Sequence, residues 1–176
     1  VREVEGDPSL ARKEIKKDNW YVNTKEDSKT DKRWKTEENQ RLLQQHTKYE
    51  IEVMKQVRNL GWVPSIRSFD LEEKNTKYIT MQKVDGDSLR KQFEKLSNDE
   101  KKKCTLPLYE SLFTAISKIH DKNIVHRDIK SDNIMVEFRL NDGLCTVDLK
   151  IIDFGLAVRG PKSSEDKVIM PKDEFE

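Results

Sequence analysis

The sequence predicts an α+β fold in two lobes: a small β-rich lobe that carries one long helix, and a mainly helical lobe that follows it. Three observations predict this arrangement. Strand-forming residues recur in short segments of the first half, around a single long helical pattern. Two helical patterns open the second half. The chain breaker Asp85-Gly86-Asp87 lies between the halves, so we place the lobes at residues 1–84 and 85–176.

The first lobe is expected to begin with two strands within residues 1–15, joined by the turn-forming triplet Gly6-Asp7-Pro8. Residues 16–33 are polar, lack sustained periodicity and are predicted to form an inserted loop. A long helix follows, with Thr36 as its expected N-cap and Gly61 as its C-terminal stop. Its apolar face repeats at steps of three and four, through Leu42, His46, Tyr49, Val53, Val57 and Leu60.

Four further strands are expected in two pairs, each around a turn. They are Ile66–Leu71 and Tyr78–Val84 around residues 73–75, and Ile134–Val136 and Leu149–Ile152 around the hairpin turn Asn141-Asp142-Gly143. The last twenty residues of the chain are loop-like.

The helical part of the second lobe is expected to begin with a short helix at Ser88–Leu96. Residues 97–100 match a capping box, which marks a helix start. Pro107 is expected in the first turn of a second helix, where proline is tolerated. The buried face of that helix is predicted to consist of Leu108, Leu112, Ala115, Ile116 and Ile119.

The composition excludes several classes of partner. Lys plus Arg (34) nearly balance Asp plus Glu (33), so no overall basic field points to nucleic acid or to an anionic membrane. No run approaches the 18 apolar residues of a membrane span. The two cysteines, Cys104 and Cys145, stand in unrelated contexts and are predicted to be reduced thiols, which favours an intracellular protein, cytoplasmic or nuclear.

Two polar segments carry the candidate chemistry: residues 126–133, His-Arg-Asp-Ile-Lys-Ser-Asp-Asn, and residues 153–155, Asp-Phe-Gly, which directly follow an apolar strand. Phosphoryl transfer from ATP depends mainly on the placement of charge. One carboxylate must meet the acceptor hydroxyl, an acidic group must hold Mg²⁺, and a cation should steady the transferred group. Asp128, Asp153 and Lys130 suit these three tasks, and Asn133 offers an amide oxygen to a second metal ion.

Together these segments resemble the signature of the eukaryotic protein kinases, and Lys130 resembles the Ser/Thr-specific members. The resemblance implies that Asp128 is the catalytic base, that Lys130 contacts the γ-phosphate, and that Asn133 and Asp153 bind magnesium. It also implies ATP as the cofactor and proteins phosphorylated on Ser or Thr as substrates, and it allows a regulatory protein partner.

The first lobe can be matched to the same family. Residues 10–13, Leu-Ala-Arg-Lys, resemble the strand whose lysine contacts the α- and β-phosphates, which implies Lys13, with Lys25 as the weaker alternative. Glu50 resembles the helix glutamate that pairs with this lysine, 37 residues further on. The resemblance implies further nucleotide contacts from Val1, Ala11, Met81, Gln82, Val84, Ser88 and Met135. It also implies an apolar spine through Met54, His126 and Phe154.

Some family features are not found in residues 1–176. The Gly-rich phosphate loop is missing before Val1, and no Ala-Pro-Glu motif follows Asp153. The family match therefore implies a partial, truncated kinase domain that ends in the activation segment, weakly active or inactive by itself. Ser163 or Ser164 is a candidate regulatory phosphorylation site. The alternative function is a catalytically silent, kinase-like regulatory or binding module.

Overall fold

The computed structural model describes residues 1–15, 37–71 and 77–160 of the chain. Several expectations lie outside the described residues: the insertion at 16–33, the Thr36 cap, Lys25, the turn at 73–75 and the two serines at 163 and 164.

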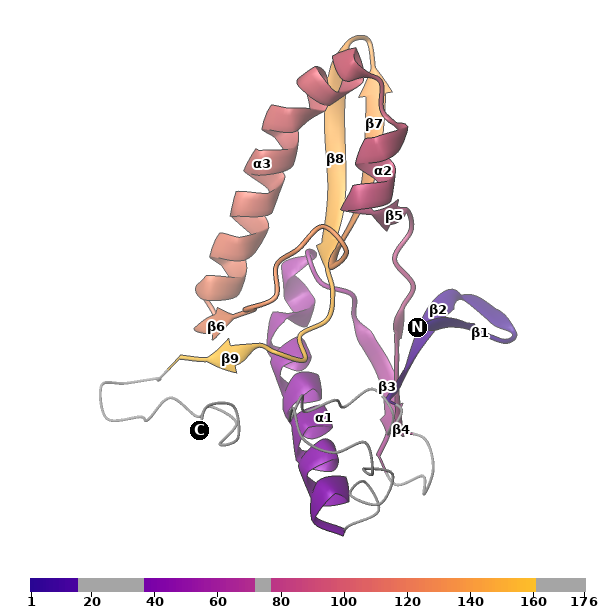
Figure 1. Ribbon diagram of the computed structural model, residues 1–176, viewed down its shortest axis with the longest axis vertical. Coiled ribbons are helices and arrows are strands. Elements are labelled where there is room, and N and C mark those ends of the chain that lie inside the picture. The colour runs from indigo at the N-terminus through magenta and orange to yellow at the C-terminus, as the bar shows by residue number, and fades with distance from the viewer. Residues whose placement is uncertain (16–36, 72–76, 161–176) are drawn as a thin grey trace, which may run out of the picture.

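The first half forms one four-stranded antiparallel sheet with a long helix, α1, beside it (Figure 1). The strands are β1 (Arg2–Val4), β2 (Asp7–Ile15), β3 (Ile66–Asp70) and β4 (Lys77–Gln82), in the order β1-β2-β4-β3. The first turn lies earlier than predicted: Asp7 and Pro8 already belong to β2, and the chain turns at Glu5 and Gly6, where Gly6 has a φ of +83°. α1 spans Glu37–Val57 and continues as a 3₁₀ turn, η3 (Arg58–Leu60).

Gly61 ends this helical segment as predicted. Its φ of +74° is left-handed, a conformation in which glycine has no Cβ penalty.

Residues 85–160 contain two helices, a three-stranded sheet and a two-stranded sheet (Figure 1). The elements are β5 (Asp87–Ser88), α2 (Leu89–Lys95), α3 (Asn98–His120), β6 (Ile124–Val125), β7 (Ile134–Asn141), β8 (Leu144–Ile151) and β9 (Val158–Arg159). β7 and β8 form the predicted hairpin, which is longer than expected, and β6 pairs with β9. The mixture of a sheet-rich half and a half with two helices confirms the α+β fold.

α3 corrects one prediction. Ser97 and Glu100 form the complete capping box, but the helix then runs without interruption to His120, so Pro107 lies inside it and does not begin a second helix. Proline removes one backbone donor and crowds the preceding turn. The predicted face is present nonetheless, with Leu108, Ala115 and Ile119 buried.

The cysteines correct a second prediction. Cys104 of α3 and Cys145 of β8 form a disulfide with an S–S distance of 2.02 Å, so the expectation of two reduced thiols is wrong. The two residues looked unrelated because they are 41 positions apart, and they meet only because α3 packs along β8. The intracellular localisation rested partly on reduced thiols and stays a prediction without that support.

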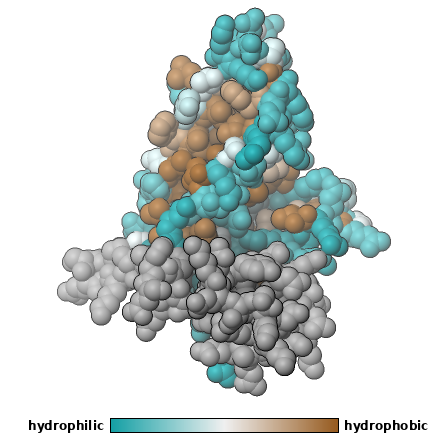
Figure 2. Space-filling view, in the orientation of Figure 1, coloured by the Kyte–Doolittle hydropathy of each residue, from teal (hydrophilic) through white to brown (hydrophobic). Residues whose placement is uncertain are grey.

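A single hydrophobic core joins the two halves, through Met54 of α1, Ile79 of β4, Ile151 of β8 and Phe154. The outer face of α3 remains apolar and exposed, with Leu106 at 66%, Tyr109 at 54% and Phe113 at 69% relative exposure. Hydrophobic side chains gather in the upper part of the molecule in Figure 2, beside α3. Among the described helices, none is long and apolar enough to cross a membrane.

Candidate active site

Strand β2, helix α1 and the loop after β8 bring a charged cluster together. The Nζ atom of Lys13 on β2 lies 2.6 Å from Oε1 of Glu50 on α1 and 2.8 Å from Oδ1 of Asp153. These residues are 37 and 140 positions from Lys13 in sequence, so the contacts depend on the fold and not on local structure. One ammonium group is thus shared between two carboxylates, one from each half of the chain.

The charges in this cluster stabilise one another. Burial lowers the pKa of Lys13, but the Glu50 and Asp153 carboxylates outweigh that effect and hold it above its usual value. Burial raises the pKa of Asp153, but the Lys13 charge and its hydrogen bond, together with the backbone N–H of Gly155, hold it below its usual value. Lys13 and Asp153 therefore both stay charged over the neutral range.

Asp128 is held by its neighbours in the segment 126–133. The Nδ2 atom of Asn133 donates to both the backbone oxygen and Oδ2 of Asp128, at 2.9 and 2.8 Å, and Lys130 Nζ lies 2.7 Å from Oδ2. Hydrogen bonding to Asp128 raises the pKa of Lys130. The Asp128 carboxylate is thus fixed in place, with a cation beside it.

His126 connects this segment to the strand that leads to Asp153. Its Nδ1 accepts a hydrogen bond from the backbone N–H of Asp128 at 3.2 Å, so Nε2 carries the proton and donates to the Ile152 carbonyl at 3.0 Å. Burial lowers the pKa of His126, which agrees with a neutral ring. The ring also packs edge-on against Phe154, with 4.6 Å between centroids.

The backbone is strained at two points of the site. Arg127 and Asp153 both have a φ of +65°, a region that residues other than glycine seldom occupy. Arg127 Nε donates to the Leu156 carbonyl at 2.6 Å, so Arg127 is bonded to the chain three residues beyond Asp153. Such conformations persist where surrounding contacts enforce them, and they cluster at functional sites.

The expected nucleotide-contacting residues are partly brought together. Ala11 and Met81 are buried and lie opposite each other in the β2–β4 register, and Ser88 lies opposite Met135 in the β5–β7 pair. The remaining expected residues are more exposed: Val84 is half-buried, Gln82 is exposed at the end of β4, and Val1 is 82% exposed.

Comparison with known proteins agrees with this geometry. A family model described as "Protein kinase domain" matches residues 9–174 of the chain. The chain belongs to the protein kinase domain family.

Relatives of known name are similar over part of their length. Serine/threonine-protein kinase 33 of Bos taurus is 30% identical over 118 residues, 66% of this chain and 24% of the relative. Sperm motility kinase Tcr mutant form of Mus musculus is 38% identical over 92 residues, 51% of this chain and 17% of the relative. A probable serine/threonine-protein kinase of Dictyostelium discoideum is 30% identical over 120 residues. The matches thus span about a quarter or less of these relatives.

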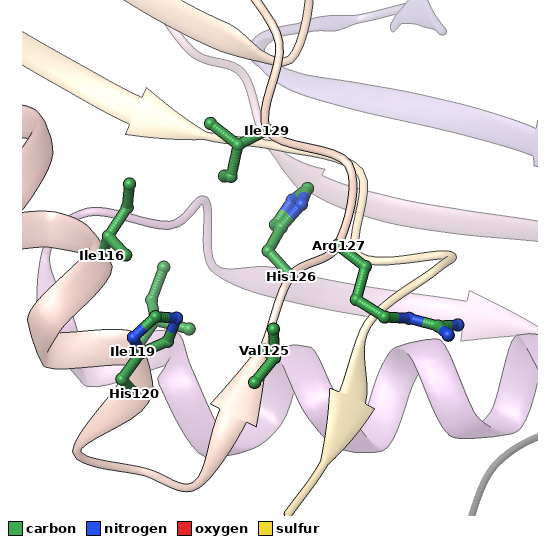
Figure 3. Close-up of a pocket in the computed structure, with 7 residues that line it drawn as sticks. All are labelled: Ile116, Ile119, His120, Val125, His126, Arg127 and Ile129. Carbon is green, nitrogen blue, oxygen red and sulfur yellow. The ribbon is translucent and has the colours of Figure 1, made fainter.

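A pocket of about 180 Å³ lies between the end of α3 and residues 125–129 (Figure 3). Ile116, Ile119 and His120 project into it from α3, and Val125, His126 and Ile129 line the opposite wall. In Figure 3 the side chain of Arg127 extends away from the α3 residues. The Lys13 cluster is not part of this pocket's lining.

Sequence reasoning missed one group of contacts to α1. Arg159 of β9 bonds to Tyr49 and to Glu52, the first through its backbone N–H at 2.8 Å and the second through its guanidinium at 3.2 Å. Tyr49 and Glu52 are three residues apart on α1 and share a face. That spacing is the only feature of the sequence that hints at these contacts, and it does not identify Arg159 as the partner.

Proposed function

We propose that this chain is the catalytic part of a protein serine/threonine kinase, which transfers the γ-phosphoryl group of Mg·ATP to Ser or Thr of protein substrates. One observation carries the proposal: the Lys13 ammonium is shared between Glu50 and Asp153, on elements from both halves of the chain. A lysine held in this way offers a fixed cation for phosphate groups, and catalysis of phosphoryl transfer consists largely of such positioning.

The donor set beside this cluster fits magnesium. Asp153 offers a carboxylate, and Asn133 commits its amide nitrogen to Asp128, which leaves its amide oxygen as the available acceptor. Mg²⁺ prefers oxygen ligands and is commonly held by one or two protein groups together with substrate phosphates. Bound there, the ion would neutralise phosphate charge.

The nucleotide base is proposed to lie between the two halves. Ala11 and Met81 supply an apolar wall from β2 and β4, and Met135 on β7 supplies a second wall from the other half. Val84 and Gln82 offer backbone groups where the chain passes from one half to the other, and Ser88 lies opposite Met135. Val1 is assigned to the same site at the edge of β1. The division of the chain into lobes at residues 1–84 and 85–176 is part of this proposal.

Asp128 is proposed to accept the proton of the substrate hydroxyl. Its carboxylate is held by Asn133 and stands next to Lys130, whose ammonium would lie close to the transferred group. The role of Lys130 in this scheme favours Ser and Thr substrates. Low kinase activity of residues 1–176 by themselves stays a prediction. It is tested by comparing their activity with that of a chain extended at both ends.

One observation favours a different function. The outer face of α3 exposes Leu106, Tyr109 and Phe113, and large apolar patches of this kind often mark interaction sites. A catalytically silent binding module would use such a face and would leave the charged cluster unused.

Nucleotide affinity in the presence of Mg²⁺ tests the proposal in the full-length protein. Asp153→Asn should abolish Mg·ATP binding, because it removes the metal-ligand charge, whereas Asp128→Asn should keep binding and lose phosphoryl transfer. Asp148→Asn removes an exposed carboxylate of β8 and is the matched control, expected to change neither. Equal loss of binding in the Asp153 and Asp128 variants would contradict the assigned roles. No binding by the unaltered protein would favour the silent module.

A further inference from the structure

We propose that Arg159 and Tyr49 are positioning residues that hold α1 against β9 and thereby set the position of Glu50. The inference rests on the proposed function, because it gives Glu50 a role in placing Lys13. It concerns a part of the chain that the kinase motifs do not include: Arg159 lies six residues beyond Asp153, and Tyr49 precedes Glu50.

Arg159 makes four contacts with one face of α1. Its backbone N–H donates to the Tyr49 hydroxyl at 2.8 Å, and its guanidinium lies 5.5 Å from the centroid of the Tyr49 ring. Its Nη2 lies 3.2 Å from Oε2 of Glu52. With its amide oxygen turned toward the guanidinium, Gln56 accepts hydrogen bonds from Nη2 and Nε at 2.9 and 3.2 Å. A helix touched over two turns by one residue cannot slide or rotate without breaking several of these contacts.

Glu50 lies on a different side of the same helix. Tyr49, Glu52 and Gln56 are separated by three and four residues and form one stripe, whereas Glu50 is rotated by about 100° from Tyr49. The Lys13–Glu50 contact therefore holds α1 from one side and Arg159 holds it from another. Because the two sets of contacts act on different sides of the helix, together they restrict its rotation more than either set does alone.

Arg159 is itself placed by the segment that leads to Asp128. β9 pairs with β6, with Arg159 opposite Ile124 and Val158 opposite Val125, and His126 follows at once. The Gly160 N–H also donates to the Asn123 carbonyl at 2.7 Å. The position of α1 is thus set relative to the strand that precedes the catalytic segment, which connects Glu50 to Asp128 through packed backbone.

The test compares Arg159→Ala, Arg159→Lys and Tyr49→Phe with the unaltered full-length protein. Arg139→Ala is the matched control, because Arg139 also pairs with a glutamate, at 2.7 Å, but at an exposed position of β7. Hydrogen exchange of residues 49–57 reports the order of α1, and the KM for ATP and kcat report the site. Tyr49→Phe should speed exchange in α1 by about tenfold, as expected for the loss of one hydrogen bond, and Arg159→Ala, which removes the three guanidinium hydrogen bonds, should speed it by at least as much.

The kinetic constants separate positioning from simple loss of stability. A displaced Glu50 lets Lys13 move, so the KM for ATP should rise several-fold, whereas partial unfolding would lower kcat and leave KM unchanged. Arg159→Lys keeps the charge near Glu52 and should restore part of the loss. In a Glu50→Gln background, Arg159→Ala should raise KM no further.

Three outcomes would overturn the inference: unchanged exchange in α1, faster exchange with an unaltered KM, or fully additive effects of Arg159→Ala and Glu50→Gln. If the unaltered protein transfers no phosphoryl group, the proposed function fails. The positioning inference is then decided by the same two substitutions in urea unfolding, where non-additive effects support it and additive effects overturn it.

Discussion

Breaking the Cys104–Cys145 disulfide should destabilise the half of the molecule that holds Asp128. The bridge closes a loop with a sequence separation of 41, and the segment 126–133 lies inside this loop. A cross-link removes conformational entropy from the unfolded chain. For a loop of this length the entropy term is about 13 cal/mol/K, or about 4 kcal/mol at 25 °C. The reduced protein should therefore lose about 4 kcal/mol of its free energy of unfolding.

Urea unfolding measures this loss directly. With a slope of about 2 kcal/mol per molar urea, the unfolding midpoint should fall by about 2 M when reductant is added. The double variant Cys104→Ala, Cys145→Ala should already have the lower midpoint. It should not respond to reductant, so it serves as the control for effects of the reductant itself. Cys104 is fully buried, so the variant also carries a packing loss that the reduced protein does not.

Two results would refute this reasoning. Titration of the denatured, unreduced protein could reveal two free thiols, which would mean that no bridge forms. Alternatively, reduction could release two reactive thiols and leave the unfolding midpoint unchanged. That result would mean that the bridge does not reduce the conformational entropy of the unfolded chain relative to the folded protein.

Three further predictions concern single residues. Because of Lys130, the full-length protein should phosphorylate Ser or Thr in a peptide-array assay, and mainly phosphotyrosine would contradict this. Burial lowers the pKa of His126, so its contribution to stability is fully present above about pH 6.5 and is lost as pH falls below that value. Between pH 7.5 and pH 5.5, the urea unfolding midpoint should therefore fall further for the unaltered protein than for His126→Gln. The exposed His120→Gln is the control. Pro107→Ala should raise the unfolding midpoint, because it restores a backbone donor in the middle of α3 at a gain of about 1–3 kcal/mol. A lower midpoint for Pro107→Ala would mean that the proline stabilises the protein by restricting the conformations of the unfolded chain.

Local signals in the sequence predicted most of the elements. The Asp142-Gly143 turn, the capping box at Ser97 and the stop at Gly61 each depend on a few neighbouring residues, and each is present in the structure. Pro107 shows where a local rule fails. A strong cap ten residues earlier and a buried face beyond it carry the helix through the proline, although the local pattern favours a new start.

Contacts between distant segments were predicted only where a motif supplied them. The Lys13–Glu50 contact was expected because both residues matched family positions, and the structure brings them to 2.6 Å. Nothing comparable marked Cys104 and Cys145, or Arg159 and Tyr49. Those pairs depend on how α3 lies along β8 and how β9 lies against α1, and a single sequence does not contain that information.

The conformation of Asp153 shows why these distant contacts matter for the site. Its left-handed backbone is unfavourable for an aspartate, so neighbouring contacts must hold it. Three hydrogen bonds do so: His126 Nε2 donates to the Ile152 carbonyl, the Ile152 N–H donates to the Asn133 carbonyl, and Arg127 Nε donates to the Leu156 carbonyl. All three come from the segment that carries Asp128, and they hold the chain on both sides of Asp153. The candidate base and the candidate metal ligand are therefore positioned as one unit, and a change that displaces residues 126–133 should displace Asp153 with them.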